Sequence, residues 1–352
     1  MNTQRSTRFP APKRGAKSLG RKKFSRPLGI SVMAMAITSL TLSACTSQPQ
    51  VQATQSATER QLVLAHADDA TSTAVATLYQ QMLESVGVKA KLGEANANPV
   101  AEVIAGKADI VVAGSTSLLE ELEKTPENKQ DSHTPPATGL SPQSSQSAGT
   151  ATGRDKNLTA DQTLKALRSL KIGELALLDS TEAHRDGVLI TTASISAAKN
   201  INNLAQLPEY CSDLEFGVPE EFSASLSAEL ETTYSCIPAR VLPVTPNDKA
   251  PVQELITNRV QVLGITSESA AIVDNGLVRL QDSEGLFSPQ TLLPLITTNE
   301  LGQDAIDAIN KVSHALKQDD LIELNRAVTG QDSLPVEIAA ADWLLERNLV
   351  GK

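Results

Sequence analysis

The chain has 352 residues, of which 40% are hydrophobic, 20% are charged and only 3% are aromatic. Its 41 acidic residues outnumber its 31 basic residues, so the formal net charge at neutral pH is −10. An acidic balance of this kind argues against nucleic acid and anionic membrane surfaces as partners. It says little about the fold, which has to be inferred from the order of elements along the chain.

The first 44 residues have the organisation of a secretory signal. Nine basic residues and no acidic residue occur before the apolar run LGISVMAMAITSLTLSA at 28–44. This run is shorter than the roughly 20 apolar residues that a membrane-spanning helix needs, and it ends in small residues. Removal of 1–44 would take away no acidic residue and would leave a formal net charge of −19.

Cys45 directly follows Leu-Ser-Ala, and the sequence LSAC resembles the lipobox of bacterial lipoproteins. This resemblance implies that the Cys45 sulfur receives a diacylglyceryl group and becomes the new N-terminus after cleavage. Two acyl chains give a stable membrane anchor. The alternative is an ordinary signal followed by an incidental cysteine. We expect a lipoprotein signal peptide at 1–44, a flexible tether at 45–60 and lipid anchoring on the extracytoplasmic face of the cell membrane.

Two further cysteines remain, Cys211 and Cys236. Outside the cytoplasm, an even pair is most simply one disulfide. Two free buried thiols are the alternative.

The first ordered part of the chain alternates between strands and helices. In order, it predicts a strand at 61–67, a helix at 68–87, a strand at 88–93, a helix at 98–108 and a strand at 108–114. Asn98 is a suitable N-cap for the second helix, with Pro99 at the first helical position. This alternation is typical of a parallel sheet covered by helices.

The segment 124–157 interrupts the regular pattern, because it is rich in Pro, Ser, Thr, Gln and Gly and almost free of apolar residues. We expect a disordered surface insertion here. Alternating helices and strands resume at 158 and continue to 350. The ordered part of the chain is too long for a single hydrophobic core, and we therefore expect two domains.

The order of these segments resembles a known family, the substrate-binding proteins of ABC importers for glycine betaine, choline and related quaternary amines. The resemblance covers about 61–123 and 158–350, and it is carried by NPVAEVIAGKADIVVAGSTSLL, LEFGVPEEF and LQDSEGLFSPQTLLPLITTNE. It implies an α/β, two-lobed, type II periplasmic-binding-protein-like fold. The two crossovers would lie near 113–117 and 264–269, with lobe one at 60–114 plus 268–352 and lobe two at 115–267.

The resemblance also implies a function. The protein would deliver a small polar or zwitterionic solute, similar to glycine betaine or choline, to the permease subunits of an ABC importer. The alternative is a receptor-like envelope lipoprotein that has lost import and acts as a sensor or interaction module. The sequence has no catalytic motif and no metal-ligand spacing, so we expect neither an enzyme nor a cofactor or metal.

Quaternary ammonium groups are usually bound by aromatic faces, and the family has two tyrosines at the first crossover. Here these positions hold Val111 and Gly114, and only Phe222 and Phe287 lie at turns that could face a cleft. The candidate ligand-binding residues are therefore mostly polar residues at strand ends, each of which also fits as a helix cap or turn residue. They are Asp69, Thr71, Asn96, Ser115, Thr116, Glu220, Phe222, Thr266, Ser267 and Glu268.

Overall fold

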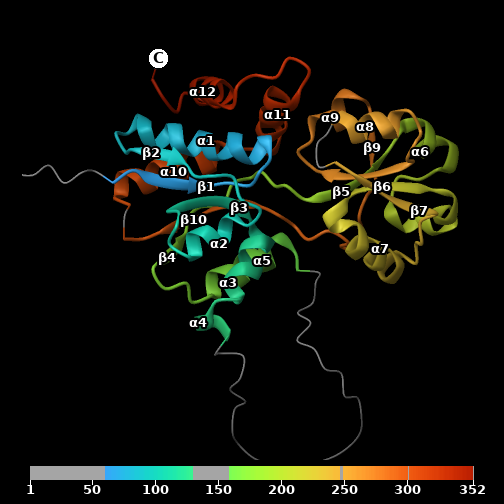
Figure 1. Cartoon of the computed structure of the whole chain (residues 1–352), viewed down its shortest axis with the longest axis horizontal. Helices are drawn as coiled ribbons and strands as arrows, with labels where there is room; N and C mark the ends of the chain where they lie inside the picture. Colours follow the sequence, from blue (N-terminus) through green and yellow to red (C-terminus); the bar gives the residue numbers. More distant parts are fainter. Residues whose placement is uncertain (1–59, 130–157, 246–248, 300, 352) are drawn as a thin grey trace, which may run out of the picture. The chain divides into compact units, whose positions relative to one another are not determined.

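The computed structural model describes residues 60–129, 158–245, 249–299 and 301–351. These residues form two five-stranded sheets, each covered by helices (Figure 1). The predicted lipidation site Cys45, most of the predicted tether and the 130–157 part of the predicted insertion lie outside the described residues. Within the predicted insertion, residues Pro126–Lys129 form a short helix, α4.

The first sheet has the strand order β2-β1-β3-β10-β4. Its strands are Leu62–Ala65 (β1), Ala90–Leu92 (β2), Ile110–Gly114 (β3), Leu175–Leu177 (β4) and Leu292–Thr297 (β10). Strand β1 pairs in parallel with both β2 and β3, whereas β10 is antiparallel to both β3 and β4.

The second sheet has the order β7-β6-β8-β5-β9. Its strands are Gly187–Thr191 (β5), Glu215–Pro219 (β6), Arg240–Val244 (β7), Val262–Thr266 (β8) and Val278–Arg279 (β9). Strand β6 pairs in parallel with β7 and β8, and β5 is antiparallel to both β8 and β9. The two sheets therefore have the same topology. In each, the fourth strand in the order, β10 or β5, runs antiparallel to the two strands beside it.

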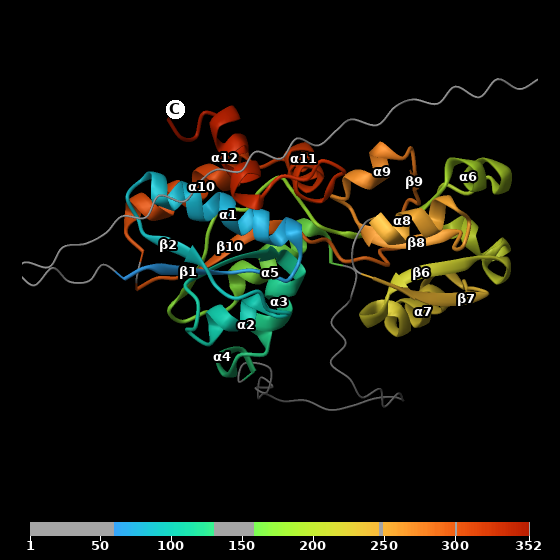
Figure 2. The ribbon, with the colours of Figure 1, turned by 45° about the horizontal axis from the view of Figure 1, so that its top comes forward.

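Helices pack on both faces of each sheet (Figures 1 and 2). On the first sheet, α1, α10, α11 and α12 contribute to one hydrophobic cluster, and α2, α3 and α5 contribute to another. These helices are Ala70–Ser85 (α1), Pro99–Ile104 (α2), Ser115–Glu123 (α3), Ala160–Ser169 (α5), Gln303–Ala315 (α10), Gln318–Thr329 (α11) and Val336–Glu346 (α12).

The second sheet is covered in the same way. Helix α7 packs on one face together with two 3-10 helices, and α8 and α9 pack on the other. The bounds are Ala193–Lys199 (α6), Leu204–Glu209 (η2), Cys211–Asp213 (η3), Glu220–Tyr234 (α7), Lys249–Ile256 (α8) and Ala270–Asp274 (α9).

The positions of the crossovers differ from the sequence prediction. Strand β4 pairs with β10 in the first sheet, and β9 pairs with β5 in the second. The chain therefore leaves the first sheet after β4 and returns to it between β9 and β10, not near 113–117 and 264–269. Residues 115–123 and 158–177, predicted for lobe two, pack on the first sheet because the apolar residues of α3 and α5 share its hydrophobic cluster. Residues 268–279, predicted for lobe one, belong with the second sheet.

Local sequence signals predicted several elements correctly. The apolar residues of α1 recur at helical spacing in the sequence and are buried, and Tyr79 among them is 0% exposed. Asn98 caps α2 by accepting a hydrogen bond from the Ala101 backbone N–H at 3.2 Å, with Pro99 at the first helical position. Thr159 caps α5 and forms a capping box with Gln162. Side chains that satisfy the free N–H groups of a first turn stabilise the helix locally, so their pattern is readable from sequence.

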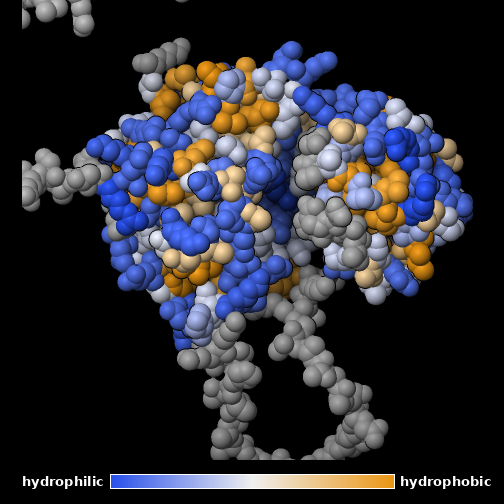
Figure 3. Space-filling view, viewed as in Figure 1, coloured by the Kyte–Doolittle hydropathy of each residue, from blue (hydrophilic) through white to orange (hydrophobic). Residues whose placement is uncertain are grey.

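Most of the face visible in Figure 3 is polar or charged, and hydrophobic residues form separate patches on it. Within the part of the chain that the structure describes, no helix has both the length and the apolar character needed to span a membrane.

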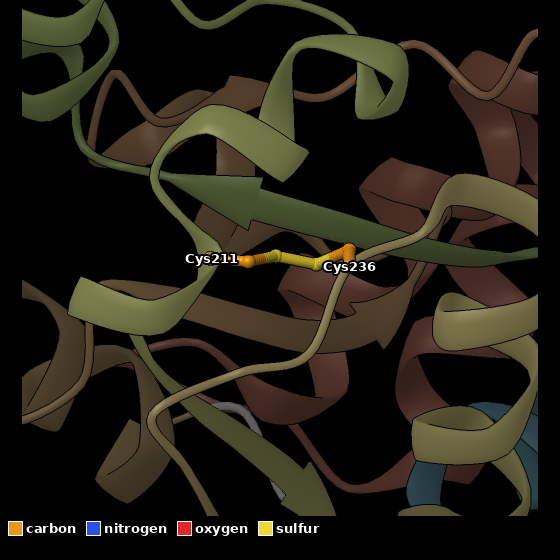
Figure 4. The surroundings of a disulfide bond; sticks show 2 residues. All are labelled: Cys211 and Cys236. Atoms are coloured by element: carbon orange, nitrogen blue, oxygen red, sulfur yellow. A yellow bond between two sulfur atoms is a disulfide. The ribbon is translucent and has the colours of Figure 1, made fainter.

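The predicted disulfide between Cys211 and Cys236 is confirmed, and the two Cα atoms are 5.5 Å apart. It joins the start of η3 to the segment that follows α7 (Figure 4). Both cysteines are buried in the hydrophobic cluster that contains Phe216 and Tyr234. The bond therefore links the segment after the C-terminal end of α7 to η3 within this cluster.

We expect loss of this disulfide to destabilise the second-sheet domain. The bond spans a sequence separation of 25, for which the chain-entropy model gives about 3 kcal/mol. In urea unfolding of a domain beginning after Cys45, the double variant Cys211→Ala/Cys236→Ala should lose a free energy of unfolding of this order. Thiol titration of the denatured, unreduced domain should detect no free thiol. Two reactive thiols, or an unchanged unfolding free energy, would contradict the assignment.

Candidate functional site

The centre of the candidate site is Arg185, which lies in the crossover between β4 and β5. Its Nε donates a hydrogen bond of 2.6 Å to Glu268 Oε1, and its Nη2 donates one of 3.2 Å to Asp69 Oδ1. Its Nη1 also donates to Ser72 Oγ at 2.5 Å. Asp69 and Ser72 belong to the start of α1, whereas Glu268 precedes α9. The Arg185 guanidinium thus links the crossover to the start of α1 in the first-sheet domain and to the start of α9 in the second-sheet domain.

The chain positions both carboxylates through helix beginnings. Asp69 is the N-cap of α1, and its Oδ1 accepts a hydrogen bond from the Ser72 backbone N–H at 2.8 Å. Glu268 lies between the end of β8 and Ser269, the N-cap of α9. Glu268 is 0% exposed. Among the residues that the structure describes, no group donates a hydrogen bond to its second oxygen, Oε2.

Charge pairing sets the ionisation of this cluster. Burial alone would raise the pKa of Asp69, but the Arg185 charge and the hydrogen bonds from Ser72 outweigh it and lower the pKa. Burial would likewise lower the pKa of Arg185, but Glu268 and Asp69 raise it above its ordinary value. Both shifts favour the charged forms, so the cluster is an ion-pair network at neutral pH.

Neighbouring residues extend this network along both crossovers. The Asp186 backbone N–H donates to Ser267 Oγ at 3.1 Å, and Asp186 Oδ1 accepts from the Gln290 backbone N–H at 2.7 Å. The Ser115 and Thr116 hydroxyls donate to the Pro289 carbonyl at 3.1 and 2.8 Å. The start of α3 is therefore connected to the crossover that contains Pro289 and Gln290.

A second polar link lies beside the Arg185 cluster. Asn325 of α11 donates from Nδ2 to Thr71 Oγ1 at 3.0 Å and accepts at Oδ1 from the Ala270 backbone N–H at 2.9 Å. Thr71 and Asn325 are both buried. Thr71 therefore joins α1 to α11, and its hydroxyl already has a partner.

The structure gathers some of the predicted site residues and separates others. Asp69, Ser267 and Glu268 join the Arg185 network directly, Ser115 and Thr116 join it through the second crossover, and Thr71 lies beside it. Asn96 instead accepts from the Asn98 backbone N–H at 2.8 Å as a turn residue. Thr266 ends β8, where it pairs with Gly187. Glu220 and Phe222 lie in the first turn of α7, and their side chains lie outside the described structure.

The aromatic residues have other roles. Tyr79 and Phe216 are fully buried, Trp343 is 6% exposed, and the Tyr234 hydroxyl donates to Asp282 at 2.5 Å. Phe287, predicted as a possible cleft residue, packs its ring against Gly187, where a larger residue would collide with it. Gly114 similarly lies against the Gln290 side chain. The described aromatic side chains therefore supply little of a cation-binding cage.

Sequence reasoning missed Arg185 and its neighbour His184. The segment STEAHRDG links two apolar strands, which is a signal for a connection between elements but not for burial. In the structure, His184 Nδ1 lies 2.6 Å from Asp186 Oδ2 with 39% of its side chain exposed. The adjacent Asp186 carboxylate raises the pKa of His184, against the opposing effects of burial and of the Arg279 charge.

A depression of about 310 Å³ between α6 and α8 is a separate feature. It is lined by Thr192, Ser194, Ile195, Ala198, Lys199, Leu255, Ile256 and Asn258 and contains none of the predicted site residues. Its one charged lining residue, Lys199, lies 4.4 Å from the centre of the Tyr210 ring. The Arg185 network is thus the better candidate, because it joins charged groups from separate elements.

A family model described as the substrate-binding domain of an ABC-type glycine betaine transport system matches residues 60–346. A crystal structure of a glycine betaine/carnitine/choline ABC transporter protein is 15% identical, with a TM-score of 0.64, and the alignment covers 83% of this chain and 99% of that chain. Apo YehZ from Escherichia coli is 16% identical, with a TM-score of 0.56 and coverage of 82% and 99%.

Lactococcal OpuAC, in its closed conformation with glycine betaine, is 14% identical, with a TM-score of 0.52 and coverage of 82% and 96%. At such identities these structures show the shared two-lobed fold. No curated protein matches the sequence significantly.

We expect Arg185→Met to be strongly destabilising, because it leaves Glu268 charged and buried without a partner. Removal of one member of such a pair costs about 3 kcal/mol or more. The matched control is Arg326→Met, since Arg326 and Asp274 form an exposed pair whose side chains are 40% and 44% accessible. That variant should lose less than about 1 kcal/mol. Equal losses in urea unfolding would contradict the central role of Arg185.

The raised pKa of His184 makes a pH-dependent contribution to stability. The pKa of His184 is higher in the folded protein than its ordinary value of 6.5. Its protonation therefore stabilises the folded state fully below pH 6.5, and this contribution is lost as the pH rises through the folded-state pKa. Wild type should therefore exceed His184→Gln in unfolding free energy by more at pH 5.5 than at pH 9. Because His184 is partly exposed, the difference should stay below about 1 kcal/mol. Asp186→Asn should remove this dependence, and its persistence in that variant would contradict the pairing.

Proposed function

This chain belongs to the family of substrate-binding domains of ABC-type glycine betaine transport systems, and we propose that it captures a small polar or zwitterionic solute while anchored by a lipid on Cys45. Solute capture for an ABC importer is the role of the family. The observation that best supports the proposal is the hydrogen-bonded network at the two crossovers, where Arg185 connects Asp69 with Glu268.

The position of this network supports a ligand site. In α/β folds, ligands bind where strands end and helices begin. Asp69 and Ser115 lie at helix beginnings that follow β1 and β3, and Glu268 lies between β8 and α9. The network thus collects charged and hydroxyl groups from both sheets' domains. Such groups suit a small polar or zwitterionic solute better than an apolar one.

The lipid anchor is supported by the sequence LSAC and by the basic and apolar segments before it. An anchored receptor stays close to the permease subunits in the membrane, which raises its effective concentration there. The anchor therefore acts on delivery of the solute and not on binding itself.

A second candidate function is that of a receptor-like envelope lipoprotein that senses a solute without importing it. It is favoured by Val111 and Gly114 of β3, which stand where the family resemblance implies two tyrosines. This alternative keeps the fold and the anchor but predicts no change in uptake when the protein is removed.

Uptake measurements test the proposal. Deletion of the gene should lower uptake of at least one labelled solute that also raises the melting temperature of the purified domain, since binding to the native state stabilises it. Unchanged uptake of every such solute would favour the sensor function.

Cys45→Ala tests the anchor separately from binding. The variant should be released from the membrane or remain as a precursor, and its purified domain should bind the same solutes as wild type. Uptake in cells should nevertheless fall. Mass spectrometry of wild-type protein that shows residues 1–44 retained and no lipid would contradict the anchor.

A further inference from the structure

Glu268 has an unused acceptor in the centre of the Arg185 network. Its Oε1 accepts from Arg185 Nε at 2.6 Å, whereas its buried Oε2 receives no donor from the described residues. A buried carboxylate oxygen without a donor is unfavourable, because it has lost its hydration without replacement. Addition of an N–H or O–H donor at this point would satisfy it.

The charged groups around Glu268 leave no net positive charge, so they do not oppose a donor that is itself a cation. The charged groups of this region are three carboxylates, Asp69, Asp186 and Glu268, and two arginines. Arg185 pairs with Asp69 and Glu268, and Arg279 donates from Nη2 to the Ser267 carbonyl at 2.5 Å. His184 is the remaining titratable group. With His184 neutral the six groups sum to −1, and with His184 protonated they sum to zero. The cluster therefore does not favour an additional anion.

Arg185 itself shows how these carboxylates hold a cation. Asp69 and Glu268 accept N–H hydrogen bonds from its guanidinium, and the described aromatic side chains provide no stacked face in the same place. An ammonium group that keeps an N–H can use the same chemistry, whereas a fully methylated ammonium has no hydrogen to donate. The two kinds of solute have similar charge and size, so this one hydrogen distinguishes them.

We propose, on the premise that the protein is a solute receptor, that Glu268 Oε2 accepts an N–H from the ligand and selects incompletely methylated cations or zwitterions over quaternary ones. Two matched pairs test this selectivity. Dimethylglycine has an N–H where glycine betaine has its third N-methyl group, and protonated dimethylethanolamine differs from choline in the same way. A hydrogen bond to a charged group corresponds to roughly 10- to 100-fold in affinity.

Calorimetry on the domain beginning after Cys45 should therefore show at least tenfold tighter binding of the N–H member in at least one pair. Glu268→Gln should abolish this preference. Its amide oxygen will keep accepting from Arg185 Nε, so the amide NH₂ replaces Oε2 and turns an acceptor into a donor. The control Asp274→Asn removes one exposed negative charge away from the cluster and should keep the preference.

Several outcomes would overturn the inference. Equal or tighter binding of glycine betaine and choline would show that Oε2 accepts no N–H from the ligand. A preference that survives Glu268→Gln would place the N–H contact elsewhere. Failure of all four compounds to bind would also overturn it, whereas the proposed function fails only if gene deletion leaves uptake unchanged. If Glu268→Gln does not fold, the wild-type ratio within each pair still decides the question.

Discussion

The ion-pair network of Arg185 is the interaction on which the candidate site depends. Asp69 and Arg185 are 116 residues apart in sequence, and Arg185 and Glu268 are 83 apart. A guanidinium can serve both carboxylates because its N–H groups point in fixed directions within one plane. The crossover that carries Arg185 is thereby fixed to α1 and to the start of α9. Any change that moves one of these elements also changes the hydrogen bonds of the others.

Helices and strands were largely predictable because their signals are local. The apolar face of α1 and the caps Asn98 and Thr159 each depend on residues a few positions apart. The disulfide was predictable for a different reason, since only one pairing of Cys211 and Cys236 exists. The fold class followed from the resemblance in segment order, and the two matching sheets agree with it.

The crossovers could not be located in the same way. Apolar alternation identifies Leu175–Leu177 as a strand, but it carries no information about its partner. That strand joins the first sheet because it pairs with β10, far along the chain. The site was predictable only in part for the same reason. Asp69 and Glu268 stood out as polar residues at strand ends, whereas the partner that unites them, Arg185, lies in a charged segment that is typical of a solvated loop.

Gly114 and the polar network are structurally connected. Gly114 allows the Gln290 side chain to lie against the end of β3, and a larger residue would collide with it. The Gln290 backbone N–H in turn donates to Asp186 at 2.7 Å, next to Arg185. A tyrosine at 114 would displace Gln290 and disturb this link between the crossovers. A tyrosine side chain at 114 and the present position of Gln290 therefore exclude each other, so Gly114 helps to keep the two crossovers connected.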